Sequence, residues 1–224
     1  MDKPIIAIIG GTGKEGMGLA TRWAAAGYQI YIGSRFEDKA KQTAGSICEM
    51  LGLTTVQGME NIEAAKNADI CVLTVVHFAH QQTLERIKDT LEGKILIDAT
   101  ARVDFNNPKP PSPPSAAEQA QNLLGPQVRV VAAFQNVPAK SLTKSIDQPL
   151  DADVLVCSDD VRAAEQVVQL VNDAGMRGIY AGILENSNVV EGLTCILIGL
   201  NKHYGIKNAG IKVAGIPLRK TSGL

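Results

Sequence analysis

Ile5-Ile6-Ala7-Ile8-Ile9-Gly10-Gly11-Thr12-Gly13-Lys14-Glu15-Gly16 is the stretch that decides the fold of this chain. It opens with an apolar run, which predicts a buried strand, and passes directly into a glycine-rich loop. Gly11, Gly13 and Gly16 have the G-x-G-x-x-G spacing that allows a tight turn, close approach of a pyrophosphate, and close packing of helix on strand. The predicted helix, from Gly16 to Ala26, offers free backbone N–H groups to phosphate oxygens. The stretch therefore predicts a dinucleotide-binding unit.

A second apolar run, at residues 29–33, arrives where a βαβ unit requires its next strand. The alternation of apolar runs and helical patterns continues to Phe134 and predicts the α/β class, with a Rossmann-type, doubly wound, mainly parallel sheet. We expect further strands at 54–56, 69–76, 94–100 and 127–134, with a turn at 58–60 and helices at 37–51, 61–67, 81–91 and 116–124.

The last third of the chain predicts a smaller, C-terminal helical part. The expected elements are strands at 153–158 and 177–180, a helix at 160–174, and an apolar helix that ends near residue 202. Asn188 and Glu191 have capping-box spacing for that last helix. So apolar a helix must be buried, either in the core or against a second subunit of a homodimer. The predicted domains are residues 1–135, which bind the dinucleotide, and residues 136–224, which complete the cleft.

Composition excludes several classes of function. The 224 residues carry a net charge of −1 with a pI near 6.3, which provides no electrostatic footprint for nucleic acid or an anionic membrane. The longest apolar-rich stretch, at 189–200, is interrupted by Glu191 and is too short to span a bilayer. The scattered cysteines form no C-x-x-C pair, so we expect neither a metal site nor disulfides, and we expect no signal peptide before the first strand. The expected location is a reducing cytoplasm.

Ser34, Arg35 and Lys39 lie directly after the second predicted strand. An acidic residue near that place binds the ribose 2′-hydroxyl of NAD, whereas an arginine accommodates the 2′-phosphate of NADP. Ser34 and Glu37 also fit a capping box for the following helix. That interpretation leaves Arg35 unexplained, because a cation in the first helical turn opposes the helix dipole unless an anion lies beside it. We therefore predict NADP as the cofactor.

Thr74 and Val75 come at the carboxyl end of the strand predicted at 69–76, and this end faces the cofactor in a sheet of this class. His77 and His80 follow. Either they touch the nicotinamide ribose or they are polar residues of a loop or helix start. The second interpretation is favoured, because neither metal-ligand spacing nor a nearby nucleophile accompanies them.

Two later segments break the regular rhythm. Residues 106–114 hold five of the ten prolines and predict an irregular loop, either a surface connection or a lip over the substrate side. Ser115 and Glu118 then have capping-box spacing. The strand predicted at 127–134 ends in polar amides followed by a proline at 135–139, which presents groups at the carboxyl edge of the sheet or caps the next loop.

Six stretches spread over nearly the whole chain carry a more specific signal. They are Gly10-Gly11-Thr12-Gly13 with Gly16 and Gly18, Gly33-Ser34-Arg35 with Lys39, Val72-Leu73-Thr74, Ser115-Ala116-Ala117-Glu118, residues 134–139, and Asn186-Ser187 with Val190-Glu191 and Leu193-Thr194. In this order the set resembles the NADP oxidoreductases of archaea and some bacteria that use the deazaflavin coenzyme F420.

The resemblance implies an NADP-binding Rossmann domain with a smaller C-terminal part, and a deazaflavin that lies over the nicotinamide in the cleft between them. It also assigns residues by matching position. Thr12, Gly13, Lys14 and Glu15 lie along the pyrophosphate; Ser34, Arg35 and Lys39 hold the 2′-phosphate; His77 and Ala139 border the nicotinamide; and Gln135, Val137 and Pro138 line the deazaflavin side.

Gln135 departs from the pattern, because the archaeal members carry histidine there. Glutamine can donate a hydrogen bond to a ring carbonyl but cannot hold a positive charge. The departure therefore concerns the deazaflavin side and not the NADP side. The proline-rich segment before Ser115 also differs and can reshape the entrance.

The implied reaction is reversible hydride transfer between NADP(H) and the deazaflavin, which demands no catalytic acid or base of a side chain and no metal. One alternative is an NADPH-dependent reductase of a carbonyl or imine, which needs a proton donor, for which Lys140 and Lys202 are the candidates. A second alternative is a non-catalytic NADP-binding sensor that acts through a partner.

Overall fold

A computed structural model of the chain describes residues 3–104, 106–143, 146 and 148–216. Helices and strands alternate as predicted. The elements in chain order are β1 (Ile6–Ile9), α1 (Lys14–Ala25), β2 (Ile30–Ser34), α2 (Glu37–Leu51), β3 (Val56–Glu60), α3 (Asn61–Asn67), β4 (Ile70–Leu73), α4 (His77–Ile87), β5 (Ile95–Asp98), α5 (Ala116–Leu124), β6 (Arg129–Ala132), α6 (Ala139–Leu142), β7 (Asp153–Val156), α7 (Val161–Asp173), β8 (Arg177–Tyr180) and α8 (Ser187–Tyr204), with 3-10 turns at Lys88–Thr90 and Leu184–Asn186.

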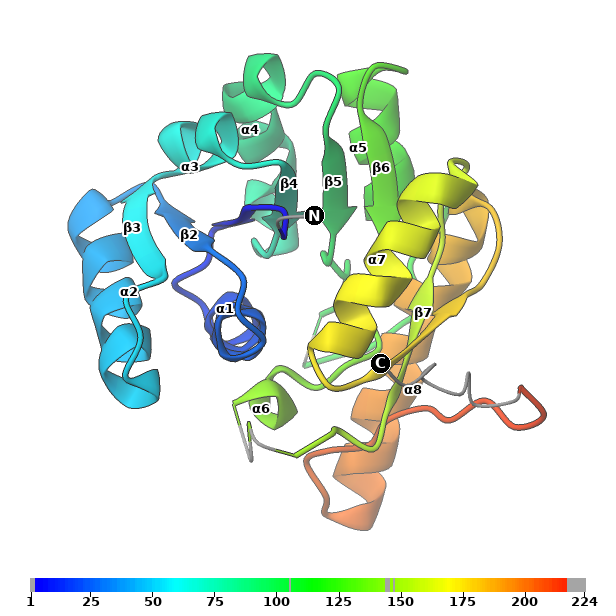
Figure 1. Cartoon of the computed structure of the whole chain (residues 1–224). Helices are drawn as coiled ribbons and strands as arrows, with labels where there is room; N and C mark the ends of the chain where they lie inside the picture. Colours follow the sequence, from blue (N-terminus) through cyan, green and yellow to red (C-terminus); the bar gives the residue numbers. More distant parts are fainter. Residues whose placement is uncertain (1–2, 105, 144–145, 147, 217–224) are drawn as a thin grey trace.

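Strands β1 to β6 form one parallel sheet in the order β3-β2-β1-β4-β5-β6 (Figure 1). This is the Rossmann order, so the predicted fold class is confirmed. The strand order reverses between β1 and β4. Ligands of such sheets bind outside the carboxyl ends of the strands at this switch point, and here the glycine-rich loop follows β1.

Helices cover both faces of the sheet (Figure 1). Residues of β1 alternate between the two cores: Ile6 and Ile8 pack with α1, α2 and α7, whereas Ala7 and Ile9 pack with α3, α4 and α5. Side chains of a strand point alternately to opposite faces, so a strand covered on both faces is apolar throughout. The continuous apolar runs in the sequence have this cause.

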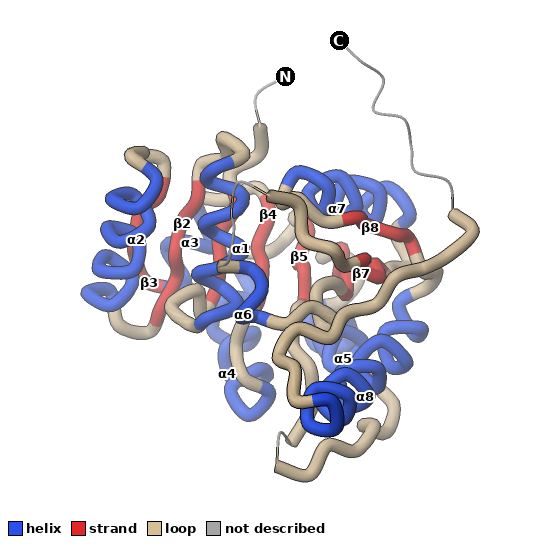
Figure 2. Tube along the Cα trace, turned by 90° about the horizontal axis from the view of Figure 1, so that it is seen from below, coloured by secondary structure: helices blue, strands red, loops and turns tan. Residues whose placement is uncertain are grey.

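The C-terminal elements pack against α1 and β6. Strands β7 and β8 form a separate parallel pair, joined to the main sheet by an antiparallel bridge between Ala132 and Cys157. The fully buried Trp23 of α1 donates its indole N–H to the carbonyl of Leu170 in α7 over 2.8 Å and meets Phe134 edge-on. Residues after α8 run back along β7, where Asp153 donates its backbone N–H to Ile211 (Figure 2).

The turn predicted at residues 58–60 is wrong, because these residues belong to β3, which pairs with β2 in parallel register from Val56 to Glu60. Gly58 misled the prediction. A Cβ atom placed there would lie 2.2 Å from the backbone of Ala40 in α2. The glycine therefore serves close packing of a helix on a strand, and not a change of chain direction.

Two of the three predicted capping boxes are also wrong. Ser34 is the last residue of β2, and α2 begins after Phe36, whose N–H donates to the Ser34 hydroxyl. Glu191 is fully buried within α8, which begins at Ser187, so it does not cap the helix. The box of Ser115 and Glu118 at α5 is confirmed in both hydrogen bonds.

Helix boundaries differ at two places that concern the site. Helix α1 begins at Lys14, two residues before the predicted start, and α4 begins at His77, four residues early. Helix α1 is the next element after β1, and α4 is the next element after β4. The starts of both helices therefore lie at its carboxyl edge.

Helix α8 is apolar around much of its circumference. Val190, Cys195 and Leu197 are buried, whereas Val189 and Ile196 are exposed. In the part of the chain that the structure describes, no helix is long and apolar enough to cross a membrane.

Candidate functional site

The glycine-rich loop has the three properties that its spacing predicts. Gly11 donates its N–H toward the carbonyls of Ile8 and Gly33, which makes the turn after β1. A Cβ atom on Gly16 would lie 2.6 Å from Cα of Gly11, so this glycine packs helix on loop. A Cβ atom on Gly13 would have only one neighbour within 4 Å, the Gly10 carbonyl oxygen at 3.9 Å. Gly13 therefore borders open space, where a phosphate can approach the backbone.

Thr74, Val75 and Asn61 hold this loop from the neighbouring elements. Thr74 donates both its N–H and its hydroxyl to the Ile9 carbonyl, over 3.0 and 3.2 Å. Val75 leaves no room for a side chain at Gly10, whose φ of 73° lies in the left-handed region. Asn61 accepts the Gly10 N–H over 3.1 Å. The structure thus brings the predicted residues Thr74 and Val75 to the loop and adds Asn61.

Helix α1 begins beside the loop without a side-chain cap, so its first N–H groups have no capping side chain. Lys14 is exposed and Glu15 is half-buried in the first turn. Burial raises the pKa of Glu15 to about 8, and the negative charge of Asp98 adds to the rise. A protonated carboxyl in this place would not repel an anion at the helix start.

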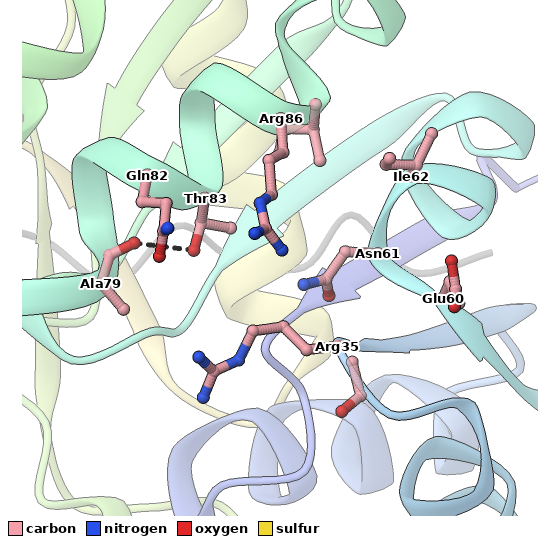
Figure 3. A pocket seen from close by; sticks show the side chains of 10 residues that line it. Arg35, Glu60, Asn61, Ile62, Ala79, Gln82, Thr83 and Arg86 are labelled. Carbon is pink, nitrogen blue, oxygen red and sulfur yellow. Dashed lines mark hydrogen bonds between the residues drawn. The ribbon is translucent and has the colours of Figure 1, made fainter.

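Ser34 and Arg35 line a pocket of about 140 Å³ between the end of β2 and helix α4 (Figure 3). Asn61 lies on one side of it, and Arg86 reaches in from α4. Lys39, by contrast, does not line the pocket: its ammonium lies 5.2 Å from the centre of the Phe36 ring. The structure therefore unites two of the three residues predicted for a 2′-phosphate and supplies one that was not predicted.

Asp98, at the end of β5, is fully buried and bonded on every side. One carboxylate oxygen lies 2.6 Å from Nε2 of His80, and the other accepts the N–H of Thr100. Because a carboxylate accepts, Nε2 of His80 carries the proton of this bond. The Asp98 carbonyl accepts the side-chain N–H of Gln135 over 2.8 Å. His80 is thus a buried partner of Asp98 within α4.

Arg102 joins the loop after β5 to helix α8. Its guanidinium donates to the buried carboxylate of Glu191 over 2.8 Å, to the Asn188 side chain, and to the Ser112 carbonyl in the proline-rich segment. Burial raises the pKa of Glu191, although Arg102 and the Ala116 N–H oppose the rise. His77 is exposed at the start of α4, and its pKa is lowered by partial burial first and by Arg102 next.

Phe134 and Gln135 form a strained corner beyond β6. Phe134 has a φ of 78°, which is uncommon for a bulky residue, and its buried contact with Trp23 holds it there. Gln135 is buried, its nitrogen is used by Asp98, and its side-chain oxygen accepts no hydrogen bond from a described residue. Gln135 therefore keeps an unbonded acceptor oxygen and, besides the N–H that binds the Asp98 carbonyl, one further amide N–H.

Val137, Pro138 and Ala139 continue from this corner. Val137 and Pro138 line a second, smaller pocket with Ser141 and Leu150, and Ala139 begins the short helix α6. Thr194 of α8 donates its hydroxyl to the Gln135 carbonyl over 2.8 Å. The corner is therefore tied to α8, while Val137 and Pro138 face the C-terminal elements.

Sequence comparison places this site in a known family. The sequence model described as "NADP oxidoreductase coenzyme F420-dependent" matches residues 5–102. The F420-dependent NADP reductases of Methanothermobacter thermautotrophicus and Methanocaldococcus jannaschii are 40% and 38% identical to this chain. Each alignment covers 95% of this chain, with 95% and 99% of the relatives. The chain belongs to the family of F420-dependent NADP oxidoreductases.

Solved structures agree with this assignment. A protein of Arthrobacter sp. FB24, named provisionally as an F420-dependent NADP reductase, has a TM-score of 0.80 and 25% identity, with 95% of this chain and all of that one covered. The NADP-bound pyrroline carboxylate reductase of Plasmodium falciparum has a TM-score of 0.61 over 92% of this chain and 66% of that one, and at 17% identity it shows the fold alone. The resemblance drawn from the six motifs is therefore confirmed.

Sequence analysis did not single out several residues of this F420-dependent oxidoreductase site. Arg86 lies in an ordinary amphipathic helix, and Asp98 is a polar residue at the end of a buried strand. Arg102 and Glu191 are far apart in sequence and only folding pairs them. Among the residues that the structure describes, no group of three or more metal-binding side chains gathers.

We expect Gly16→Ala to lower the free energy of unfolding of this protein by about 1–3 kcal/mol, because the new Cβ overlaps the Gly11 backbone. Gly13→Ala should leave the free energy of unfolding within about 1 kcal/mol of wild type but weaken NADPH binding, because its Cβ projects into open space. Gly45→Ala, in the exposed interior of α2 with nothing within 4 Å, is the control. Urea unfolding and NADPH titration measure both effects; equal NADPH affinity in Gly13→Ala and wild type would contradict the phosphate approach.

Glu15 should make stability fall as pH rises. Its pKa is 4.5 unfolded and about 8 folded, so the folded state binds the extra proton, and the stabilisation is complete below about 4.5 and lost through about 8. Glu15→Gln should flatten this slope between about pH 5 and about pH 9, whereas Glu49→Gln, on the exposed side of α2, should keep it. Urea unfolding across that range decides; parallel slopes for wild type and Glu15→Gln would show that the Glu15 carboxyl ionises normally.

Proposed function

We propose that this protein transfers a hydride reversibly between NADP(H) and coenzyme F420. The main support is the near full-length sequence similarity to archaeal F420-dependent NADP reductases. A glycine loop that leads into α1 and a cationic pocket after β2 add to it. The nicotinamide supplies the hydride, or the deazaflavin does in the reverse direction, and each carries that chemistry itself. The protein supplies binding, orientation and exclusion of water.

The residues of the NADP side fit the cofactor. Thr12, Gly13, Lys14 and Glu15 would lie along the pyrophosphate at the start of α1, while Gly11 and Gly16 hold the loop closed beneath it. Ser34 and Arg35 would receive the 2′-phosphate, with Lys39 adding positive charge from α2. Thr74 and Val75 would support the loop, and His77 and Ala139 would border the nicotinamide.

Gln135, Val137 and Pro138 would line the deazaflavin side, completed by residues 136–224 as the smaller part of the cleft. Gln135 there offers its unbonded oxygen and its second amide N–H, because the Asp98 carbonyl takes only one N–H. A ligand N–H matches the oxygen, and a ligand carbonyl matches the remaining N–H. This adds an acceptor to the donor role that the sequence suggested and keeps Gln135 compatible with a ring system that carries both N–H and carbonyl groups.

No side chain of this site needs to act as an acid or base. Lys140 and Lys202, the proton donors required by a carbonyl or imine reductase, are both exposed, on α6 and in the last turn of α8. Burial keeps Asp98 and Glu191 away from solvent, and both are bonded within the protein. Their task is to hold the loops after β5 and β6 in place, which fixes the walls of the cleft.

Anaerobic stopped-flow mixing with NADPH and oxidised F420 tests the reaction. We expect enzyme-dependent loss of the deazaflavin absorbance, with Lys140→Met and Lys202→Met both turning over at wild-type rates. Bound NADPH without bleaching of F420 would overturn the proposal. Bleaching that fails in one lysine variant, with folding intact by circular dichroism, would instead favour a proton-transfer reductase.

We further propose a cytoplasmic homodimer. The four cysteines are free, as in a reducing compartment. Val189, Ile196, Leu200 and Tyr204 are exposed on α8 at spacings of seven, four and four residues, which places them on one face. A helix face of this composition is suited to a second copy of itself.

Ile196→Lys should dissociate the dimer, because a charge replaces an apolar side chain at the centre of that face. Sedimentation equilibrium should give twice the chain mass of 23.8 kDa for wild type and the chain mass for the variant. Ile62→Lys, which changes an exposed apolar residue on α3, should leave the dimer intact. A monomeric wild-type protein at micromolar concentration would refute the dimer.

A further inference from the structure

Two arginines from different elements reach into the same pocket. Arg35 follows β2 and Arg86 lies in α4, and both guanidinium groups enter the space between these elements (Figure 3). Within the described residues, neither arginine forms an ion pair with a carboxylate. Glu60 lines the pocket too, but its carboxylate forms an ion pair with neither arginine. The pocket therefore has an excess of positive charge.

The position of Arg86 has an ordinary explanation, which the geometry does not support. A cation in the last turn of a helix stabilises the terminal carbonyl groups. No hydrogen bond joins Arg86 to those carbonyls in the described structure, and the side chain is directed into the pocket instead (Figure 3). Thr90 donates its hydroxyl to the Ile87 carbonyl and so satisfies one of them. The guanidinium of Arg86 remains available to a ligand.

The other polar groups of the pocket narrow the choice of ligand. Thr83 already donates to the Ala79 carbonyl over 2.7 Å, and the Asn61 oxygen accepts from Gly10. The Asn61 amide nitrogen stays free to donate, since it bonds to no described residue. Beside the Glu60 carboxylate and the Gln82 amide, the pocket thus presents two guanidinium groups and an amide N–H as donors, and these donors match a phosphate monoester with two negative charges.

We propose that Arg86 is a second specificity-determining residue for the 2′-phosphate of NADP, opposite Arg35. This proposal rests on the proposed NADP function. It adds α4 to the phosphate site, whereas the residues predicted for the phosphate all follow β2. Arg35 and Arg86 would bind the phosphate oxygens from opposite walls. A 2′-hydroxyl in the same place leaves both cations without a counter-charge, so the arrangement rejects NAD as well as binding NADP.

Isothermal titration with 2′,5′-ADP and 5′-AMP isolates the phosphate, because the two ligands differ by that group alone and neither requires the deazaflavin. Arg86→Gln should weaken 2′,5′-ADP about ten- to a hundredfold and 5′-AMP less than about twofold. Arg86→Lys should show an intermediate loss, because charge is kept and the bidentate geometry is lost. Arg162→Gln, the same change on the exposed face of α7, should alter neither.

The outcomes separate the two proposals. Preference for 2′,5′-ADP that is lost in Arg35→Ala but kept in both Arg86 variants would overturn the role of Arg86 and leave NADP binding standing. Equal weakening of both ligands in Arg86→Gln would mean contact with the adenine and would also overturn it. A wild-type protein that binds 5′-AMP as tightly as 2′,5′-ADP would refute the NADP assignment itself. In steady-state assays Arg86→Gln should raise KM for NADPH and leave kcat unchanged, which a general loss of structure would not do.

Discussion

The buried carboxylate of Asp98 is the constraint on which the cleft depends. An unpaired charge in a fully buried position would cost several kcal/mol, so every oxygen of this residue must be bonded. His80 of α4 and Thr100 of the next loop bond the two carboxylate oxygens, and the Gln135 side chain beyond β6 donates to the backbone carbonyl. One residue at the end of a central strand thereby fixes the side of α4, the exit of β5 and the exit of β6. The three segments that border the cleft cannot shift independently.

A second set of constraints is steric and lies on the other side of the switch point. Gly16 meets Gly11, and Val75 fills the place of a side chain at Gly10, so loop, helix and neighbouring strand fit only in the absence of side chains. At Phe134 the chain instead accepts an uncommon backbone conformation, stabilised by burial against Trp23. Contact with Trp23 also joins this corner to α1. Packing contacts thus hold both walls of the site in place.

Local patterns in the sequence predicted most of the fold and several residues that line the site. The apolar run and glycine spacing at residues 5–16 indicate a strand, a turn and a helix start. These three parts interact with one another, so the local sequence is sufficient to predict them. Ser34 and Arg35 follow from their place after β2. Gly58 was misread because a glycine required by a neighbouring helix looks the same as one required by a turn. Arg86, and the pairing of Arg102 with Glu191, arise from contacts between distant segments and leave no local signal.

Charge is distributed unevenly along the site, and this distribution suits an extended, asymmetric cofactor. The end near β2 carries Arg35 and Arg86 in an open pocket, where solvent screens them and an anion can enter. The end near β5 holds Glu15, Asp98 and Glu191, and there burial raises the pKa of Glu15 and of Glu191. An anion is therefore attracted to the first end, whereas at the second end the carboxylates of Asp98 and Glu191 are bonded by His80 and Arg102. Under the proposed function, this difference would orient the cofactor with its 2′-phosphate toward Arg35 and Arg86 and its ring toward the buried end of the site.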